Sequence, residues 1–344
     1  MKLLSKLKKL PWKTCLLRVD FNINPTDGKN AFRFTSSLPT IKLLLKKGAR
    51  VVLMSHRGRP RQELGIRNQE LGKRELSLKP FADLLQKVLK KKVNFLENIP
   101  ESIPEAGELF LLENLRFDER EEKNSVELAM ELAKLGDFYV NDAFAVSHRA
   151  NASVVELPKL LPAFAGLLLE KEIEHLTKAM KSPKKPLVLI FGGVKIEDKA
   201  PVIKNLLSKA SQVLLGSGAL NDRRALPKSP KIIYPTDWLS EENKAMDIGP
   251  LTVEEYNEVI KKAKTIIWNG PLGYFENVKY AGGSKAIAKL VAQSKAHTIV
   301  GGGETTELIL SMKLEKKIDF LSTGGGAMLD FLAGKKLPGI EALG

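Results

Sequence analysis

The sequence has a single cysteine and no long apolar run, and each absence excludes a class of protein. Cys15 has no second cysteine to pair with, so an internal disulfide framework is excluded and a reducing compartment is expected. No stretch reaches the roughly 18 uninterrupted apolar residues that a membrane span needs. The first nine residues mix Lys with Leu and supply no signal-peptide core. We therefore expect a cytoplasmic protein with no membrane partner.

The sequence also lacks the common nucleotide-binding motifs. No segment has the G-x-x-x-x-G-K-[ST] pattern, so an ordinary P-loop is excluded. The nearest approach to a dinucleotide fingerprint is Gly216-Ser-Gly-Ala-Leu-Asn221, in which Asn221 stands where the motif has its third glycine. The next residues, Asp222 to Pro230, are too few and too interrupted by proline for the crossover helix of that motif. A hydride-transferring enzyme is therefore disfavoured.

What the chain does have is positive charge, and its distribution is informative. The formal net charge is +15 over 344 residues, a length sufficient for two domains with their own cores. Of the 13 arginines, 11 precede residue 150, and of the 26 glycines, 19 follow it. Arginine binds carboxylate and phosphate through a planar fork, whereas glycine-rich loops offer backbone N–H groups to polyphosphates. The two halves are therefore expected to bind two different small anions.

A charge of this size is also compatible with nucleic-acid binding. Nucleic-acid-binding proteins more often interleave basic residues with exposed aromatic residues, and aromatic residues make up only 6% of this chain. Nucleic-acid binding is therefore kept only as a remote alternative.

Short apolar runs, which predict buried strands, alternate with amphipathic stretches, which predict helices. In the first half the predicted strands are Thr14–Val19, Ala49–Met54, Val93–Leu96, Leu109–Leu112 and Asp137–Val140, and the predicted helices include Leu38–Lys46, Leu78–Lys91 and Val126–Leu135. In the second half the predicted strands are Leu187–Phe191, Val213–Leu215, Ile232–Tyr234, Thr265–Trp268, Thr298–Val300 and Ile318–Leu321. A capping box, Thr252-Val-Glu-Glu255, predicts the start of a helix that runs to about Lys262. The alternation predicts an α/β protein built from two doubly wound parallel-sheet domains.

A helix predicted over residues 167–180 is a natural connection between the domains, because Pro162 precedes it and Pro183 and Pro186 follow it. We therefore expect a first domain at 1–166, a connecting helix at 167–182, a second domain at 183–330 and a tail at 331–344.

Five predicted strands of the second half run straight into glycine. These loops begin at Gly192-Gly193, Gly216-Ser-Gly218, Asn269-Gly-Pro-Leu-Gly273, Gly301-Gly302-Gly303 and Gly324-Gly325-Gly326. The carboxyl ends of parallel strands share one edge, where ligands of open α/β sheets bind. Taken alone, Gly192-Gly193 with Lys195 and Lys199 would be no more than a tight turn between solvated lysines. Five such loops on one edge predict a nucleotide or polyphosphate site.

Arginines follow several predicted strands of the first half. The segments concerned are Arg18-Val-Asp-Phe-Asn22, Ser55-His-Arg-Gly-Arg-Pro60, Glu113-Asn-Leu-Arg-Phe117 and Val140-Asn-Asp-Ala-Phe144, which leads to His148-Arg149. A cluster of like charge costs energy unless an anion occupies it. The sequence therefore predicts an anion site at the carboxyl edge of the first sheet.

Together with Gly192-Gly-Val-Lys195, Trp268-Asn-Gly-Pro-Leu-Gly-Tyr-Phe-Glu276, Ser322-Thr-Gly-Gly-Gly-Ala327 and Leu337-Pro-Gly-Ile-Glu-Ala-Leu343, these segments resemble the successive motifs of the phosphoglycerate kinase family. They occur in that family's order and span nearly the whole chain. The resemblance implies reversible phosphoryl transfer from 1,3-bisphosphoglycerate to Mg-ADP, giving 3-phosphoglycerate and ATP in glycolysis and gluconeogenesis. It also implies a monomer whose domains close over a hinge-type cleft, with the tail packed on the first domain.

The resemblance implies the following site residues. Phosphoglycerate would be bound by Asp20, Phe21, Asn22, Arg33, His56, Arg57, Gly58, Arg59, Arg116 and Arg149. The nucleotide would be bound by Gly193, Lys195, Lys199, Gly216, Asn269, Pro271, Glu276, Gly302, Gly303, Glu304, Thr305, Gly324 and Gly325, with Glu304 serving Mg²⁺. Arg33 and Lys195 would be catalytic, because phosphoryl transfer needs positioning and positive charge around the transferred group. No general base is needed, since the attacking oxygen is already an anion.

Two departures from the family pattern bear on the nucleotide. Glu304 stands where the family usually has aspartate, and Mg²⁺ demands near-ideal octahedral geometry. After Gly216-Ser-Gly-Ala-Leu220 the family usually has several dozen more residues, whereas this chain passes directly to the strand at Ile232. The adenine side of the pocket should therefore be reduced. An alternative is a phosphoglycerate-binding homologue with weak or no kinase activity.

Overall fold

The computed structural model describes residues 1–7, 10, 13–60, 74–222, 224 and 226–344. These residues form two compact units, one of Met1–Glu172 with Lys336–Gly344 and one of Ile173–Lys335. Among the described residues, no helix is both long and apolar enough to cross a membrane.

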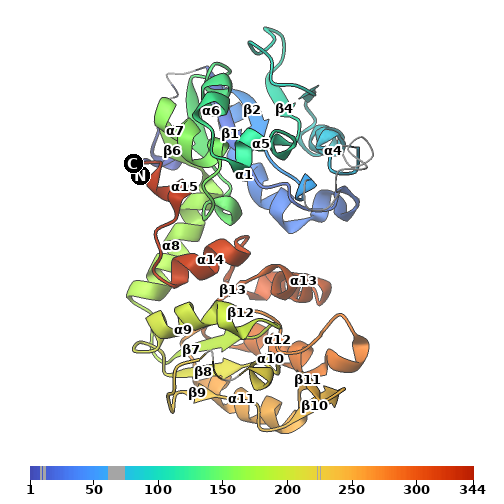
Figure 1. Cartoon of the computed structure of the whole chain (residues 1–344), viewed down its shortest axis with the longest axis vertical. Helices are drawn as coiled ribbons and strands as arrows, with labels where there is room; N and C mark the ends of the chain where they lie inside the picture. The colour runs from blue at the N-terminus through green and yellow to red at the C-terminus, as the bar shows by residue number, and fades with distance from the viewer. Residues whose placement is uncertain (8–9, 11–12, 61–73, 223, 225) are drawn as a thin grey trace. The chain divides into compact units, whose positions relative to one another are not determined.

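The first unit is built on a six-stranded sheet whose strands are all parallel (Figure 1). The strand order is β3 (Asn94–Leu96), β4 (Leu109–Leu112), β2 (Arg50–Met54), β1 (Thr14–Arg18), β5 (Phe138–Asn141) and β6 (Ala163–Ala165). β1 lies in the middle, with β2 on one side and β5 on the other, so the strand order reverses at β1. In a doubly wound sheet ligands bind outside the carboxyl end of the strand where the order reverses. Residues 19–22 follow β1 at that place.

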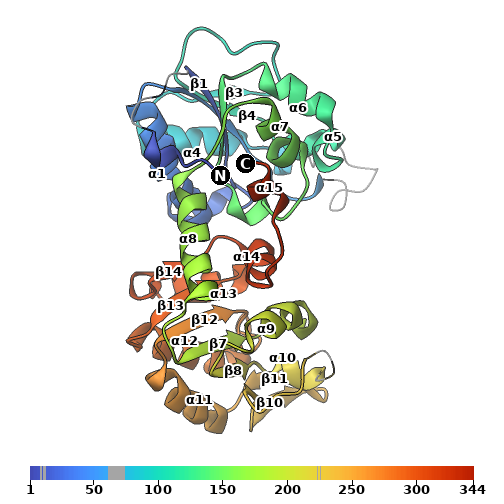
Figure 2. The ribbon, with the colours of Figure 1, turned by 90° about the vertical axis from the view of Figure 1, so that its left-hand side faces the viewer.

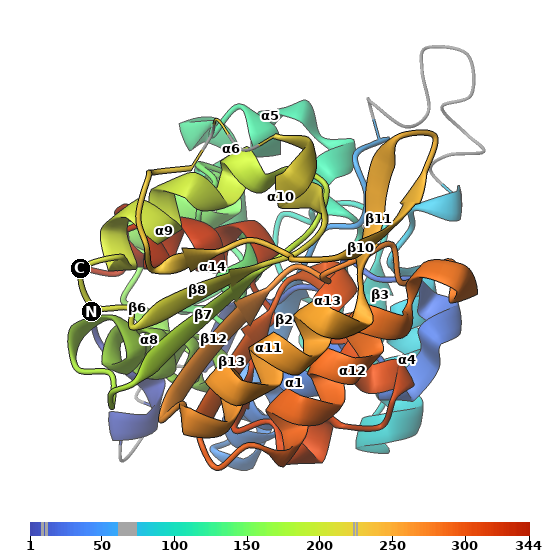
Figure 3. The same ribbon diagram turned by 90° about the horizontal axis from the view of Figure 1, so that it is seen from below.

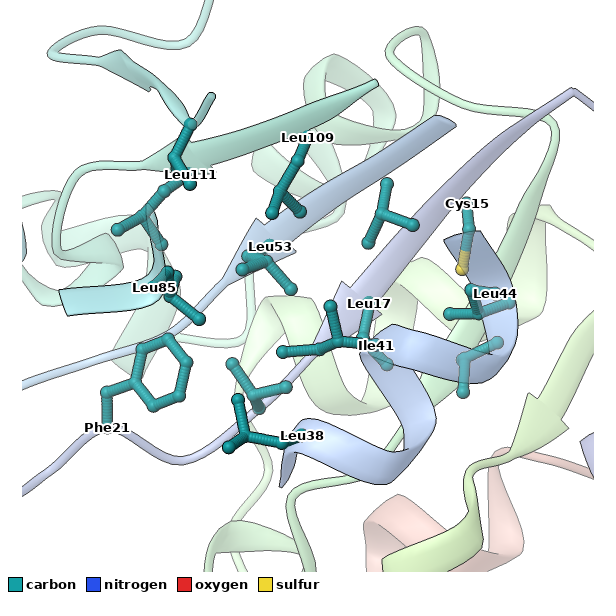
Figure 4. Packing of buried hydrophobic residues seen from close by; sticks show 14 of the residues in the cluster. Cys15, Leu17, Phe21, Leu38, Ile41, Leu44, Leu53, Leu85, Leu109 and Leu111 are labelled. Carbon is teal, nitrogen blue, oxygen red and sulfur yellow. The ribbon is translucent and has the colours of Figure 1, made fainter. Parts of the chain in front are cut away.

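Alternate residues of these strands pack under helices α1 (Phe32–Lys46) and α4 (Lys79–Leu89). Figure 4 shows this core, in which Cys15 and Leu17 of β1 lie near Ile41 and Leu44 of α1. The helices α5 (Glu119–Glu122), α6 (Val126–Ala133) and α7 (Leu157–Leu160) complete the unit. Helix α6 begins where the sequence predicts, because the Ser125 side chain accepts a hydrogen bond from Leu128 N–H.

The C-terminal helix α15 (Pro338–Glu341) belongs to the first unit although its residues end the chain. Gly339 N–H donates to the Ser147 carbonyl (2.9 Å), and Asn141 Nδ2 donates to the Gly339 carbonyl (3.2 Å). A side chain at Gly339 would meet Val154 Cγ1 at 2.4 Å. Glycine is therefore required for this close approach.

The second unit also has a parallel six-stranded sheet. The strand order is β14 (Phe320–Leu321), β13 (His297–Gly301), β12 (Thr265–Asn269), β7 (Leu187–Phe191), β8 (Gln212–Leu215) and β9 (Ile232–Ile233). Phe191 pairs with both Leu215 and Asn269, and Asn269 pairs with Gly301. The glycines that follow four neighbouring strands, Gly216, Gly192, Gly270 and Gly302, therefore lie in one row at the carboxyl edge, and the predicted shared edge is confirmed.

Helices cover both faces of this sheet (Figure 3). Helices α11 (Pro250–Lys262), α12 (Gly282–Gln293) and α13 (Gly303–Ser311) bury the face that includes Ile190 and Trp268. The other face is covered by α9 (Ala200–Leu206), α14 (Gly325–Leu332) and the C-terminal part of α8 (Leu167–Lys181). Helices α9 and α14 lie side by side (Figure 2), joined by a 2.8 Å hydrogen bond from Asn205 Nδ2 to the Leu332 carbonyl. The short helix α10 (Gly218–Asn221) follows β8. The expected fold class of two parallel-sheet α/β domains is thus confirmed.

Three local expectations are wrong. Helix α1 begins at Phe32 rather than Leu38 and contains Pro39 within its length. Helix α11 begins at Pro250, so Thr252 lies inside its first turn and no Thr252–Glu255 capping box forms. The Asp237 carboxylate instead accepts hydrogen bonds from the N–H groups of Leu251 (3.1 Å) and Thr252 (2.7 Å).

Two elements have no counterpart among the predicted strands. One is β6, and the other is an antiparallel hairpin of β10 (Trp238–Glu241), which is exposed, and β11 (Lys244–Ile248), which is partly buried.

Candidate functional site

In the first unit, cationic side chains surround His56, which follows β2 and is 2% exposed. Burial lowers the pKa of His56 well below its ordinary value, and Arg18, Arg116, Arg33 and Arg149 lower it further in that order. These arginines come from the end of β1, the segment after β4, helix α1 and the segment after β5. The structure therefore brings together four of the predicted residues, His56, Arg33, Arg116 and Arg149, in one positive site.

Asparagine side chains hold the loops of this site in place. Asn22 Oδ1 accepts a hydrogen bond from Gly58 N–H (2.8 Å), which ties the loop after β1 to the loop after β2. Asn114, which follows β4, accepts from the N–H groups of Arg57 and Arg116 and donates to the Arg57 carbonyl. These bonds fix the backbone on which the cations stand, which is the preorganisation that an anion site needs.

Two of the arginines carry their own acidic neighbours. Arg33 Nη1 lies 3.3 Å from Asp20 Oδ2, an oxygen that is buried and makes no hydrogen bond within the described residues. Arg116 donates to the Gly58 carbonyl (2.7 Å), and its Nε lies 3.3 Å from Glu122 Oε1. Burial lowers the pKa of Arg116 to about 10. Because Arg116 is buried, water solvates its charge poorly, and an anion arriving there would be attracted.

Three other predicted residues are arranged differently. The Phe21 side chain is fully buried against Phe34 and Phe81, and its N–H donates to Ser55 Oγ, so its side chain does not face the cationic site. Arg57 Nε donates to the Ile23 carbonyl (3.1 Å) and Nη1 donates to the Glu75 carbonyl, which makes this guanidinium a tie between loops. Arg59 is exposed and is not among the groups that lower the pKa of His56.

The family resemblance assigns no site role to Arg18, Glu121, Ser153 or Asn114. Arg18 and Asn114 do lie in segments that the sequence associates with the anion site, Arg18 within a predicted strand and Asn114 after one. Glu121 is acidic in a basic half, and Ser153 lies in a short π-helical turn, Ala152–Glu156, that no periodicity signals.

In the second unit the glycine loops approach one another closely at the carboxyl edge. A side chain at Gly192 would meet the Pro271 carbonyl oxygen at 1.9 Å, and one at Gly270 would meet the Gly192 carbonyl oxygen at 2.2 Å. Gly193 N–H donates to the Pro271 carbonyl (2.8 Å). At Gly216, a side chain would meet Leu272 Cα at 2.9 Å. The loops therefore pack backbone against backbone, which only glycine permits.

Helices α13 and α14 both begin at this edge, after Gly302 and Gly324, and neither N-terminus has a side-chain cap. A Cβ at Gly325 would lie 4.0 Å from Gly302 Cα and Gly303 N, so the two N-termini adjoin. Gly302 has φ +102°, and Thr305 Oγ1 accepts from Gly270 N–H (2.8 Å). Uncapped N–H groups and two helix dipoles make this place favourable for phosphate.

Charged side chains border these N-termini. Partial burial lowers the pKa of Lys199, while Asp198, Glu304 and Glu197 raise it, so Lys199 and Glu304 lie within electrostatic reach of each other. Lys195 and Glu276 are exposed. Asn269 and Pro271 are buried, and Asn269 Nδ2 lies 3.9 Å from Met328 Sδ. Asn269 and Pro271 therefore support the glycine loops from the buried side.

Among the described residues, no group of three or more His, Cys, Asp or Glu side chains could hold a metal ion alone. Glu304 stands in the first turn of α13 as a single carboxylate beside the place favourable for phosphate. Mg²⁺ is commonly bound by one or two carboxylates together with substrate phosphates and water. The donor set therefore fits a magnesium ion that arrives with a nucleotide, and does not fit a resident metal.

These features define a two-unit α/β protein with a cluster of arginines around His56 at the edge of one sheet and two uncapped helix N-termini in glycine-rich loops at the edge of the other. The phosphoglycerate kinase family profile matches residues 6–223 and 219–335. Curated phosphoglycerate kinases of Herpetosiphon aurantiacus and Moorella thermoacetica are 41% and 39% identical, with 96% and 99% of both chains covered. Solved structures of phosphoglycerate kinases from Coxiella burnetii (34% identity, TM-score 0.81) and Pyrococcus horikoshii (32%, 0.82) cover 99% and 100% of this chain and 98% of theirs. The chain belongs to the phosphoglycerate kinase family.

The comparisons also locate a shortened segment. The alignment with the Herpetosiphon protein runs over 386 positions, more than the 344 residues of this chain, so that relative has residues without a counterpart here. The two segments matched by the family profile meet at residues 219–223, within and just after α10. This is the place where the sequence predicts that the nucleotide half is trimmed.

Proposed function

We propose that this chain is a phosphoglycerate kinase that transfers the acyl phosphate of 1,3-bisphosphoglycerate to Mg-ADP, giving 3-phosphoglycerate and ATP, and that it catalyses the reverse reaction. The observation that carries the proposal is the pair of preorganised anion sites in a member of this family, each at the carboxyl edge of its parallel sheet. Such sites suit a reaction that needs positioning and charge stabilisation more than covalent chemistry.

The first unit is proposed to bind the phosphoglycerate. Its cluster offers His56, Arg33, Arg116 and Arg149 to a ligand with one carboxylate and one phosphate. Asp20 accepts from Asn22 N–H (2.9 Å) and pairs with Arg33, which leaves it suited to a substrate hydroxyl. The walls and border of this site would then include Phe21, Arg57, Gly58 and Arg59. Arg33 is the arginine that we assign to the transferred phosphoryl group.

The second unit is proposed to bind the nucleotide. The adjoining N-termini of α13 and α14, with Gly193, Gly216 and the Asn269–Pro271 loop, would hold the phosphates, and Lys199 and Glu276 would border them. The ammonium group of Lys195 would stabilise the negative charge of the phosphoryl group while it is transferred. Glu304 would hold magnesium, which neutralises phosphate charge when bound. No side chain is needed as a general base, because the attacking oxygen is already an anion. The side chains contribute positioning and positive charge.

The trimmed segment leads to a finer proposal about the nucleoside. If the residues that normally surround the nucleotide base are missing after α10, contacts to the phosphates should supply most of the binding affinity for the nucleotide. Steady-state assays with 3-phosphoglycerate and ATP, GTP or ITP test this. Similar kcat/KM values for the three nucleotides support the proposal, and a strong preference for ATP contradicts it.

Calorimetry separates the kinase from a homologue that only binds phosphoglycerate. Titrations of 3-phosphoglycerate and Mg-ADP into the same preparation should both show saturable binding. Binding of 3-phosphoglycerate with no binding of Mg-ADP would overturn the kinase assignment.

We further propose a monomer that works in the cytoplasm on small-molecule substrates. The thiol of Cys15 is buried in the core of the first unit, and burial raises its pKa. Both effects make the thiol unreactive, which is compatible with a reducing compartment such as the cytoplasm. Light scattering on the purified chain tests the monomer, since a dimer would double the measured mass.

A further inference from the structure

A buried network connects His56 to side chains that do not face the proposed substrate site. Arg18, at the end of β1, is 1% exposed, and its Nη2 lies 3.3 Å from His56 Nδ1. Its Nε donates to Ser153 Oγ (2.9 Å), and its Nη1 donates to the Val19 carbonyl (2.6 Å). Each of the three guanidinium nitrogens is therefore engaged within the protein.

The charge of Arg18 is balanced inside the same network. Glu121 is 1% exposed, and its Oε1 lies 3.7 Å from Arg18 Nη2. Glu121 also accepts hydrogen bonds from Ser153 Oγ (2.6 Å) and Ser153 N–H (2.9 Å). A buried ion pair of this kind needs further hydrogen bonds to offset desolvation, and Ser153 supplies them. Arg18 is therefore paired with a buried carboxylate and held in place by hydrogen bonds to groups within the unit.

The contact between Arg18 and His56 determines which ring nitrogen carries the proton. A guanidinium can only donate, so His56 Nδ1 must accept and cannot carry hydrogen. A neutral imidazole with a bare Nδ1 carries its hydrogen on Nε2. His56 then presents a donor at Nε2 and no acceptor, which matches an oxyanion.

The surroundings also oppose a second proton on His56. Arg18 on β1, Arg33 on α1, Arg116 after β4 and Arg149 after β5 all face the ring, and each disfavours an imidazolium. Burial acts in the same direction and is the largest cause of the lowered pKa. Burial and the four arginines therefore all favour the neutral ring over the cation.

We propose that the Arg18–Glu121–Ser153 network fixes His56 as the neutral tautomer protonated at Nε2, so that His56 is a permanent neutral hydrogen-bond donor to an oxyanion of the substrate. Arg18 is then a positioning residue. The proposal rests on the proposed function only for the identity of that oxyanion, a phosphoglycerate. Substrate binding should take up no proton at His56, because the ring already has the form that the anion requires.

Two-bond ¹H–¹⁵N spectra of imidazole rings in the full chain test the proposal directly, because they distinguish the two neutral tautomers and the cation. The chain has only four histidines, His56, His148, His175 and His297, so a His56→Gln variant suffices to assign the signal. In the wild type we expect His56 to show an unprotonated Nδ1 and a protonated Nε2 from about pH 5 to about pH 8. A protonated Nδ1 or a cation at neutral pH would overturn the proposal without any variant.

The double variant Arg18→Met/Glu121→Gln removes the donor and its counter-charge together, so that no buried charge is left alone. A matched control is Lys91→Met/Glu108→Gln, which removes a 2.5 Å Lys–Glu pair from the same unit, on segments that contribute no residue to the network. If the double variant does not fold, the spectrum of the wild type still tests the tautomer.

In the double variant we expect His56 to populate both neutral tautomers and KM for 3-phosphoglycerate to rise about tenfold, while the control leaves both unchanged. An unchanged tautomer in Arg18→Met/Glu121→Gln would contradict the role of Arg18. The spectra need no turnover, so a chain with the fixed tautomer but no kinase activity would refute the proposed function alone.

Discussion

Asp142 Oδ1 accepts a 2.8 Å hydrogen bond from Leu168 N–H at the start of helix α8. The same oxygen accepts from Leu169 N–H at 3.2 Å. A carboxylate at a helix N-terminus is normally stabilised as the anion. Here burial outweighs that effect and raises the pKa of Asp142 to about 7. The hydrogen bonds between Asp142 and the first turn of α8 are therefore sensitive to pH.

The raised pKa predicts that Asp142 lowers stability as pH increases. Between its ordinary value of 3.8 and the folded value of about 7, the native state binds more protons at this site than the unfolded state does. The stabilising contribution is present below pH 3.8 and is lost as pH rises through 7. Asp142→Asn keeps an oxygen acceptor and removes the ionisation. Urea unfolding followed by circular dichroism should show this variant gaining roughly 1–4 kcal/mol relative to wild type between about pH 5 and about pH 8. Parallel stability profiles for the two proteins would show that Asp142 does not titrate in this way.

A second prediction concerns the contact between Gly192 and Pro271. A Cβ at Gly192 would meet backbone atoms of Pro271 and Gly270 at 1.9–2.9 Å, and backbone cannot move aside as a flexible side chain can. Gly192→Ala should therefore lower the free energy of unfolding by about 1–3 kcal/mol or more. Gly303→Ala is the matched control, since a Cβ there meets nothing within 4 Å. Calorimetric melting should separate the two variants. Equal melting temperatures would mean that the loops are not as closely packed as described.

The strands were predictable because each is a short apolar run ending in glycine or a polar segment. The predicted bounds of Leu109–Leu112 and Leu187–Phe191 match β4 and β7, and most others differ by one or two residues at an end. Parallel strands buried on both faces produce such runs whatever their neighbours are. The strand order then places the predicted loops on shared edges.

What could not be predicted depends on tertiary contacts. Helix α1 begins early because Phe34 is fully buried in the core, although residues 32–37 show no simple helical pattern. The β10–β11 hairpin lies largely at the surface, so its strands lack the apolar run of a buried strand. In the site, the charged neighbours of Arg18 and Arg116 are Glu121 and Glu122, residues of a one-turn helix that is too short to show an apolar periodicity. Only packing of α5 against the strand ends brings them there.

Lys195→Ala tests the residue to which we assign charge stabilisation. Its side chain is exposed, so the substitution should leave the fold intact. Loss of one preorganised charge donor should lower kcat by about 100-fold or more, equivalent to about 2.7 kcal/mol. Lys261→Ala is the control, because Lys261 pairs only with exposed Glu258 on α11. Near-normal turnover of Lys195→Ala in a coupled assay would remove Lys195 from the mechanism.

Glu304 should govern the preference for magnesium-bound nucleotide. Replacing its carboxylate by an amide in Glu304→Gln removes the only acidic side chain in the first turn of α13. We expect the affinity for Mg-ADP to fall roughly tenfold or more, with little loss of affinity for ADP in a chelator. Glu304→Asp retains the carboxylate and should lie between Glu304→Gln and wild type, or above wild type if the extra methylene is unfavourable. The calorimetric ratio of Mg-ADP to ADP affinity decides, and an unchanged ratio in Glu304→Gln would exclude Glu304 as the ligand.

The most direct measurement is the formation of an acyl phosphate from ATP and 3-phosphoglycerate, trapped with hydroxylamine as the hydroxamate. Trapping distinguishes phosphoryl transfer to the carboxylate from simple hydrolysis of ATP. The account predicts hydroxamate that requires the enzyme, ATP, magnesium and 3-phosphoglycerate, with turnover on the order of 1–100 per second. Hydrolysis of ATP without hydroxamate, or no reaction in a chain that binds both ligands, would contradict it.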